Sequence, residues 1–201
     1  MSAPRSNSGH TATPSCNVSS KREVARLIDA APKGRNRVLL KLLYVSGVRV
    51  SELCGLKWCD AVARQEGGRI TVFGKGGKTR TILLKPKVWQ QLQSLKGVAK
   101  AAEPIFRSRR GGGALDVSQV RRIVYAARKK AGLEQKVSPH WMRHAHASHA
   151  LDRNAPIHLV QVTLGHGSVS TPGRYLHARP AEAPVSTCRI SGHCLVCWMR
   201  L

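Results

Sequence analysis

Two stretches of the sequence place basic side chains where helices are expected to begin. Arg49 lies just after Gly47, a residue type that commonly ends a helix. His140 and Arg143 follow a Ser-Pro helix-start signal and lie three residues apart, on one face of the expected helix. Free N–H groups and the helix dipole favour anions at such positions, so a phosphate could bind there.

Three further residues add an ammonium, a second imidazole and a phenol to this set. Lys75 lies near the tip of an expected β-hairpin, between the segments RITVF and TRTILL. His166 directly follows an expected helix end, and Tyr175 comes nine residues later on an expected short helix. Together with the two arginines, these residue types suit chemistry on a phosphodiester.

Each of these residues also has an ordinary structural explanation. Arg49 could form an ion pair with Glu52, one helical turn later, and His140 could cap its own helix. Tyr175 could be a packed or hydrogen-bonded surface residue, while the second histidine could be structural and the hairpin lysine a solvated turn residue. Taken one at a time, the residues leave both explanations open.

The elements that must position these side chains are mostly helices. Apolar residues recur at helical spacing in most of the chain, whereas residues 69–84 alternate and contain the turn sequence GKGGK. Helices are expected over about 21–31, 38–46, 87–95, 116–131, 139–153 and 156–164, with another beginning around Val50–Ser51 and a short one from Thr171-Pro172. Caps and breaks support these bounds, including Asp116 as an N-cap and Gly132 as a stop.

The sequence is strongly basic, with 34 Lys and Arg residues against 10 Asp and Glu residues and a net charge of +24. Such an excess favours a polyanionic partner, most simply nucleic acid, although ribosomal-type proteins and membrane-surface binders are also basic. No segment resembles a membrane span, and the N-terminus lacks the apolar core of a secretory signal. We therefore expect a cytoplasmic protein with reduced cysteines and no membrane partner.

Four blocks of the sequence, in this order, resemble those of one known family. They read LLYVSGVRVSELCGLKW, VFGKGGKTRTILL, SPHWMRHAHASHAL and LGHGSVSTPGRYLH. The most specific parts are G-x-R-x-S-E-L, H-x-x-R-H, and L-G-H followed by R-Y. From about Lys21 to Pro180, the chain is similar to the catalytic domain of the tyrosine recombinase (phage integrase) family.

This resemblance implies a mainly α fold with a small antiparallel β-sheet and gives each candidate residue a role. Arg49 and Arg143 match the catalytic arginines, and Glu52 the acidic residue that supports the site. His140 and His166 match the two histidines of the family. Lys75 matches the hairpin lysine, the best candidate to protonate the leaving oxygen, and Tyr175 the nucleophile.

The resemblance also implies how the reaction proceeds and what the protein binds. The tyrosine would become linked to a 3′ phosphate of double-stranded DNA, and a 5′ hydroxyl would later reverse the step. Neither a nucleotide, a metal nor another cofactor would be needed, and the enzyme would work as a homo-oligomer, a tetramer on two DNA duplexes. We expect further phosphate contacts outside the site from Lys78, Arg80, Arg109, Arg121 and Arg122.

Two regions depart from the family pattern. Residues 1–20 read as a disordered arm, in place of the helical core-binding domain that family members carry before the catalytic domain. Residues 181–201 form an atypical tail with one C-x-x-C, which is half of a zinc pattern, so we expect no metal there. A truncated, catalytically impaired DNA-binding remnant is therefore the alternative function, and a topoisomerase-like enzyme is a third.

Overall fold

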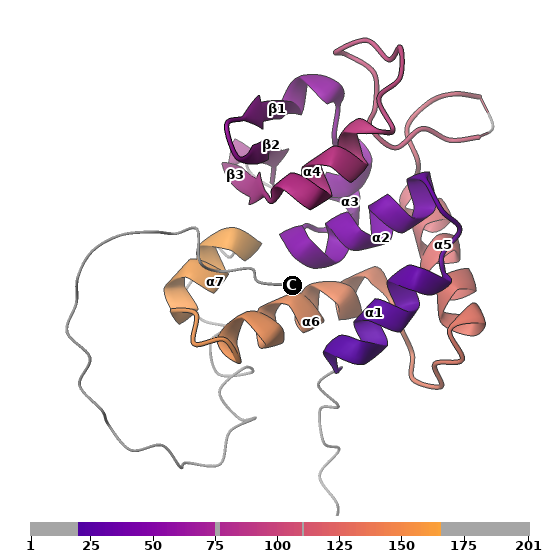
Figure 1. Ribbon diagram of the computed structural model, residues 1–201, viewed down its shortest axis with the longest axis vertical. Helices are drawn as coiled ribbons and strands as arrows, with labels where there is room; N and C mark the ends of the chain where they lie inside the picture. Colours follow the sequence, from indigo (N-terminus) through magenta and orange to yellow (C-terminus); the bar gives the residue numbers. More distant parts are fainter. Residues whose placement is uncertain (1–19, 75–76, 110, 166–201) are drawn as a thin grey trace, which may run out of the picture.

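The computed structural model describes residues 20–74, 77–109 and 111–165. Along the chain it contains α1 (Lys21–Ala30), α2 (Arg35–Ser46), α3 (Val50–Gly55), the short 3₁₀ helix η1 (Trp58–Asp60), β1 (Ala61–Arg64), β2 (Gly67–Phe73), β3 (Thr79–Leu84), α4 (Pro86–Gln93), α5 (Val117–Lys130), α6 (Pro139–Leu151) and α7 (Ile157–Leu164) (Figure 1). The predicted arm, tail and short helix after Thr171 lie outside the described residues, as do Lys75, His166 and Tyr175.

The helices begin where the sequence supplies capping side chains. Ser20 and Glu23 form a reciprocal capping box at the start of α1, and Asp116 and Gln119 form another at the start of α5. Ser138 accepts a hydrogen bond from a backbone N–H in the first turn of α6, which has proline at its first position. These caps confirm the predicted helix starts.

The predicted hairpin is confirmed, and it belongs to a three-stranded antiparallel sheet in the order β1-β2-β3. Ile70 on β2 faces Ile82 on β3, and both side chains are buried. At Gly68 an added Cβ would lie 2.1 Å from Cε3 of Trp89, so the glycine lets α4 pack closely against the sheet. The sequence pattern did not predict β1, a four-residue strand whose side chains are mostly exposed.

Helix α2 lies at the centre of the molecule, between α4 and α6 in Figure 1. Four of its leucines are at most 1% exposed and join one large core that also includes the buried face of the sheet and the apolar stripe of α5; they are Leu39, Leu40, Leu42 and Leu43. A second, smaller core joins α6 to α7 and contains Ala147, Ala150, Ala155, Val160 and Leu164. None of the helices in the described segments is long and apolar enough to cross a membrane.

Candidate functional site

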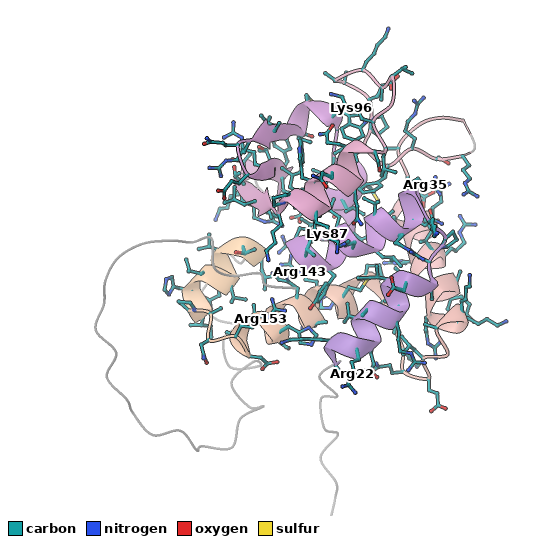
Figure 2. The ribbon with its side chains drawn as sticks, in the orientation of Figure 1. Arg22, Arg35, Lys87, Lys96, Arg143 and Arg153 are labelled. Carbon is teal, nitrogen blue, oxygen red and sulfur yellow. The ribbon has the colours of Figure 1, made fainter. Side chains whose placement is uncertain are left out.

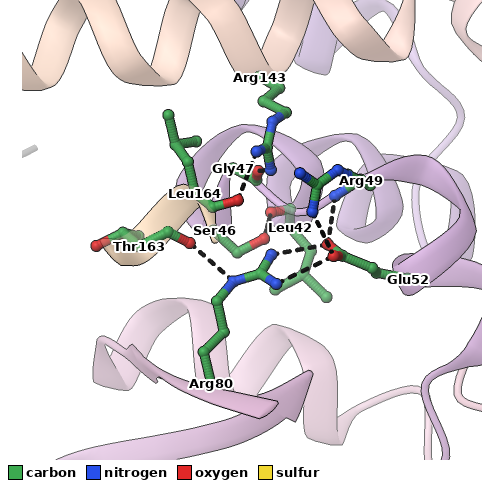
Figure 3. Close-up of polar contacts among 9 residues, drawn as sticks. All are labelled: Leu42, Ser46, Gly47, Arg49, Glu52, Arg80, Arg143, Thr163 and Leu164. Atoms are coloured by element: carbon green, nitrogen blue, oxygen red, sulfur yellow. Dashed lines mark hydrogen bonds and ion pairs between the residues drawn. The ribbon is translucent and has the colours of Figure 1, made fainter. Parts of the chain in front are cut away.

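The carboxylate of Glu52 lies at the centre of a group of arginines (Figure 3). Its Oε1 accepts hydrogen bonds from Nη1 of Arg49 and Nη1 of Arg80, both at 3.0 Å. Its Oε2 accepts from the backbone N–H of Arg49 and from Nη2 of Arg80, both at 2.7 Å. The ion pair of Arg49 with Glu52 that residue spacing suggested is therefore present, and it is shared with a third residue.

The sequence of α3 explains why Glu52 turns inward. Arg49 is the N-cap residue of this helix and Glu52 is its third residue, so the carboxylate reaches back to the N–H of Arg49. Only 4% of the Glu52 side chain is exposed, against 41% of the Arg49 side chain. The helix start thus buries the carboxylate and leaves the Arg49 guanidinium open to a ligand.

The charge of Glu52 is maintained by its partners. Burial alone would raise the pKa of this carboxyl, but the hydrogen bonds from Arg80 and Arg49 outweigh burial and hold the pKa below its usual value. Glu52 is therefore an ionised acceptor at neutral pH, and it fixes the direction of both guanidiniums.

Arg143 reaches the same region from α6, as Figures 2 and 3 show. It is buried, and its Nη1 donates to the carbonyl oxygen of Gly47 at 2.5 Å. Its Nη2 donates to the carbonyl oxygen of Leu164, also at 2.5 Å. Arg143 therefore ties the turn before Arg49 to the end of α7.

That turn depends on Gly47. Its φ is +59°, in the left-handed region, where it caps the C-terminus of α2. An added Cβ would lie 2.7 Å from Cδ2 of His146 and 3.0 Å from Cδ2 of Leu164. The glycine thus meets both a backbone and a packing requirement, and it brings α2, α6 and α7 together two residues before Arg49.

His140 lies one helical turn before Arg143 and is exposed. Its ring centroid is 4.3 Å from that of His144, so the two imidazoles are in contact on the surface of α6. Within the part of the chain that the structure describes, no three histidine, cysteine or acidic side chains are grouped as metal ligands. The structure thus places both His140 and Arg143 on α6, with His140 exposed and Arg143 buried.

Another histidine of α6, His146, is half-buried and packs against Gly47, and the sequence predicted no role for it. Burial lowers the pKa of His146 to about 4, and the positive charge of Arg143 lowers it further. The position of His146 in the sequence could have indicated that it faces the interior, because it lies three residues after Arg143 and therefore on the same face of the helix.

His146 predicts a loss of stability in acid. Its folded pKa of about 4 is below the unfolded value of 6.5, so the unfolded chain takes up a proton that the folded chain does not between these values. The free energy of unfolding should therefore fall as the pH drops from 6.5 to 4, by about 2 kcal/mol between pH 7 and pH 5 from this residue.

Urea unfolding at pH 7, 6 and 5 measures this loss. The variant His146→Gln carries no titrating ring, so its free energy of unfolding should fall less steeply over the same range. Equal slopes for the two proteins would show that another group titrates.

The remaining predicted contacts fall into two groups. Four of them are exposed, namely Lys78, Arg109, Arg121 and Arg122. Arg80 differs, because its side chain is only 10% exposed and its Nε donates to the carbonyl oxygen of Thr163 at 2.8 Å, in addition to the two bonds to Glu52. Sequence reasoning treated Arg80 as a surface cation and missed this arrangement.

Basic side chains are also distributed over the other elements. Figure 2 labels Arg22 on α1, Arg35 on α2, Lys87 on α4 and Arg153 after α6. At the site itself, the guanidiniums of Arg49 and Arg80 bind the one carboxylate of Glu52, and the guanidinium of Arg143 binds the carbonyl oxygen of Gly47. Three positive charges and one negative charge make the site positive. An arrangement of this kind can hold a phosphate and stabilise negative charge that develops on it.

The chain is similar to known proteins over most of its length. The profile of the phage integrase family matches residues 18–182. Tyrosine recombinase XerC from Thermodesulfovibrio yellowstonii is 39% identical in an alignment over 153 residues that covers 71% of this chain and 50% of that protein. The chain spans about half the length of the curated relatives it matches.

Solved structures show the same fold. The crystal structure of XerA recombinase superposes with a TM-score of 0.71 and 34% identity, covering 80% of this chain and 60% of that one. The XerH site-specific recombinase bound to palindromic difH substrate, in a post-cleavage complex, gives a TM-score of 0.68 and 26% identity over 79% of this chain and 49% of that one. The mainly α fold with a small antiparallel sheet is therefore that of tyrosine recombinase catalytic domains.

Proposed function

Because the chain belongs to the phage integrase family, we propose that it acts as a site-specific DNA recombinase or integrase that cleaves and rejoins strands through a 3′-phosphotyrosyl intermediate. One observation supports this function most directly. Arg49 and Arg143, far apart in sequence, meet at the Gly47 turn, where Glu52 orients one guanidinium and two carbonyl oxygens hold the other. A pair of fixed guanidiniums is what a phosphodiester needs as it gains negative charge.

In the proposed reaction, the phenol oxygen of Tyr175 attacks the scissile phosphorus, and the bond from phosphorus to the 5′ oxygen breaks. A histidine or a water takes the phenol proton, and Lys75 gives a proton to the leaving 5′ oxygen. Arg49, Arg143, His140 and His166 surround the phosphate. The new phosphotyrosine bond conserves the energy of the broken one, so a second 5′ hydroxyl can attack it and rejoin the strands.

Double-stranded DNA is the proposed partner. The net charge of +24 and the positive site support it, as does the DNA bound to lambda integrase (residues 75–356), a solved structure 25% identical to this chain. Lys78, Arg109, Arg121 and Arg122 are proposed to contact backbone phosphates outside the site, since all four are exposed. A homo-oligomer, a tetramer on two duplexes, is the proposed assembly, because exchange of strands needs two cleaved duplexes.

A nicked suicide substrate tests this function. Once cleaved, such a DNA loses the short fragment that carries the 5′ hydroxyl, so the phosphotyrosine product accumulates and survives denaturation. We expect a covalent protein–DNA product whose peptide map places the DNA on Tyr175. Salt-dependent DNA binding without any covalent product would instead identify a DNA-binding remnant, and relaxation of a supercoiled plasmid without strand exchange would identify a topoisomerase-like enzyme.

A further inference from the structure

Arg80 connects three parts of the site through one side chain (Figure 3). Arg80 lies on β3, and its two terminal nitrogens donate hydrogen bonds to both carboxylate oxygens of Glu52 on α3. Its Nε donates to the carbonyl oxygen of Thr163 near the end of α7. Two parallel hydrogen bonds between a guanidinium and a carboxylate fix the geometry of the pair. The side chain of Arg80 is 10% exposed and that of Glu52 is 4% exposed. All three guanidinium nitrogens of Arg80 thus already donate within the protein.

The charges of the group explain what this pair does for Arg49. Glu52 orients Arg49, but a carboxylate beside a guanidinium also cancels much of the positive field that a phosphate would experience. Arg80 supplies a second positive charge to the same carboxylate at 2.7 Å. Arg49, Arg80 and Glu52 together carry one net positive charge. Of the two guanidiniums, that of Arg49 is the more accessible to a ligand, because its side chain is 41% exposed.

We propose that Arg80 is a positioning residue of strand cleavage: as the counter-ion of Glu52, it leaves the charge of Arg49 available to the scissile phosphate. This inference rests on the proposed function. It differs from a direct phosphate contact, which would place the guanidinium against DNA and would be read out as affinity and salt dependence.

Single-turnover cleavage of the suicide substrate at saturating DNA separates the two roles. We expect Arg80→Met to lower the cleavage rate about 10- to 100-fold, because small displacements of transition-state donors have effects of this size. DNA affinity and its salt slope should stay close to those of the wild type. Arg80→Lys keeps the positive charge but cannot donate both hydrogen bonds to Glu52, so it should lower the cleavage rate less than Arg80→Met does.

A double-mutant cycle of Arg80 and Glu52 shows whether the effect of Arg80 on the cleavage rate depends on the charge of Glu52. Glu52→Gln keeps the shape of the side chain and removes its charge, so Arg80 should no longer be needed as a counter-ion. We expect the double variant Arg80→Met/Glu52→Gln to cleave within about threefold of Glu52→Gln alone, since the coupling between the two residues should account for most of the Arg80 effect. The double variant leaves no unpaired buried charge, which keeps the comparison possible even if Arg80→Met alone does not fold.

Thermal unfolding of each variant serves as the folding control, and Arg107→Met provides a matched substitution. Arg107 pairs with Glu103 at 3.3 Å on an exposed part of the chain, and its loss should leave cleavage unchanged. The proposal is overturned if removing Arg80 slows cleavage equally with Glu52 and with glutamine at position 52, or if it weakens DNA affinity without slowing saturated cleavage. Absence of a covalent product with the wild type would instead refute the proposed function itself.

Discussion

Replacing Tyr175 by phenylalanine is expected to abolish the covalent protein–DNA product completely. Phenylalanine keeps the ring and removes the oxygen that would form the bond to phosphorus, so no phosphotyrosine can arise. DNA binding depends on contacts between basic groups and phosphates, which this substitution leaves in place, and the dissociation constant should change by less than about threefold. Denaturing gel electrophoresis of the suicide-substrate reaction and a binding titration measure the two quantities.

The chain offers matched controls for this experiment, because it contains three tyrosines. Tyr125 on α5 is 60% exposed, and the hydroxyl of Tyr44 is hydrogen-bonded to Nδ1 of His149 at 2.8 Å. Tyr125→Phe and Tyr44→Phe should both retain the covalent product. A product that persists in Tyr175→Phe and disappears in one of these variants would assign the nucleophile to a different residue.

Arg49→Gln is expected to slow strand cleavage about 10²- to 10³-fold, the usual effect of removing one donor that stabilises negative charge in a transition state. Glutamine can still reach toward Glu52, and the backbone N–H that starts α3 remains, so the fold should survive. Single-turnover cleavage at saturating DNA gives the rate, and thermal unfolding reports on the fold.

Arg107→Gln is the matched control for Arg49→Gln. The Arg107 side chain is 50% exposed and pairs with Glu103, much as the 41% exposed Arg49 pairs with Glu52. If the loss of any exposed Arg–Glu pair slowed cleavage, Arg49→Gln and Arg107→Gln would lower the cleavage rate to the same extent. Equal rates for the two variants would contradict the proposed role of Arg49 at the phosphate.

Much of the fold could be predicted from local sequence. Helix starts at Asp116 and Ser138 follow from capping side chains that act within three residues, and the hairpin follows from alternation around a glycine-rich turn. Strand β1 could not be predicted this way, because its mostly exposed side chains leave no alternating apolar pattern. Its existence depends on pairing with β2, which is a tertiary contact.

In the candidate site, too, contacts between residues close in sequence could be predicted and contacts between distant residues could not. The pairing of Arg49 with Glu52 is a contact over three residues and follows from helix geometry. The contacts of Arg80 with Glu52 and Thr163 span 28 and 83 residues, and that of Arg143 with Gly47 spans 96. No local pattern encodes contacts of that range, which is why Arg80 appeared in the sequence as one more basic surface residue.

The second, smaller core has a consequence for local unfolding. Three of its five buried residues are alanines, which bury little apolar area, and α7 is only eight residues long. The end of this helix is held instead by guanidiniums on the carbonyl oxygens of Thr163 and Leu164. Backbone amides of α7 should therefore exchange with deuterium before those of α2, and each opening would free the residue from which the chain continues toward Tyr175, the proposed nucleophile.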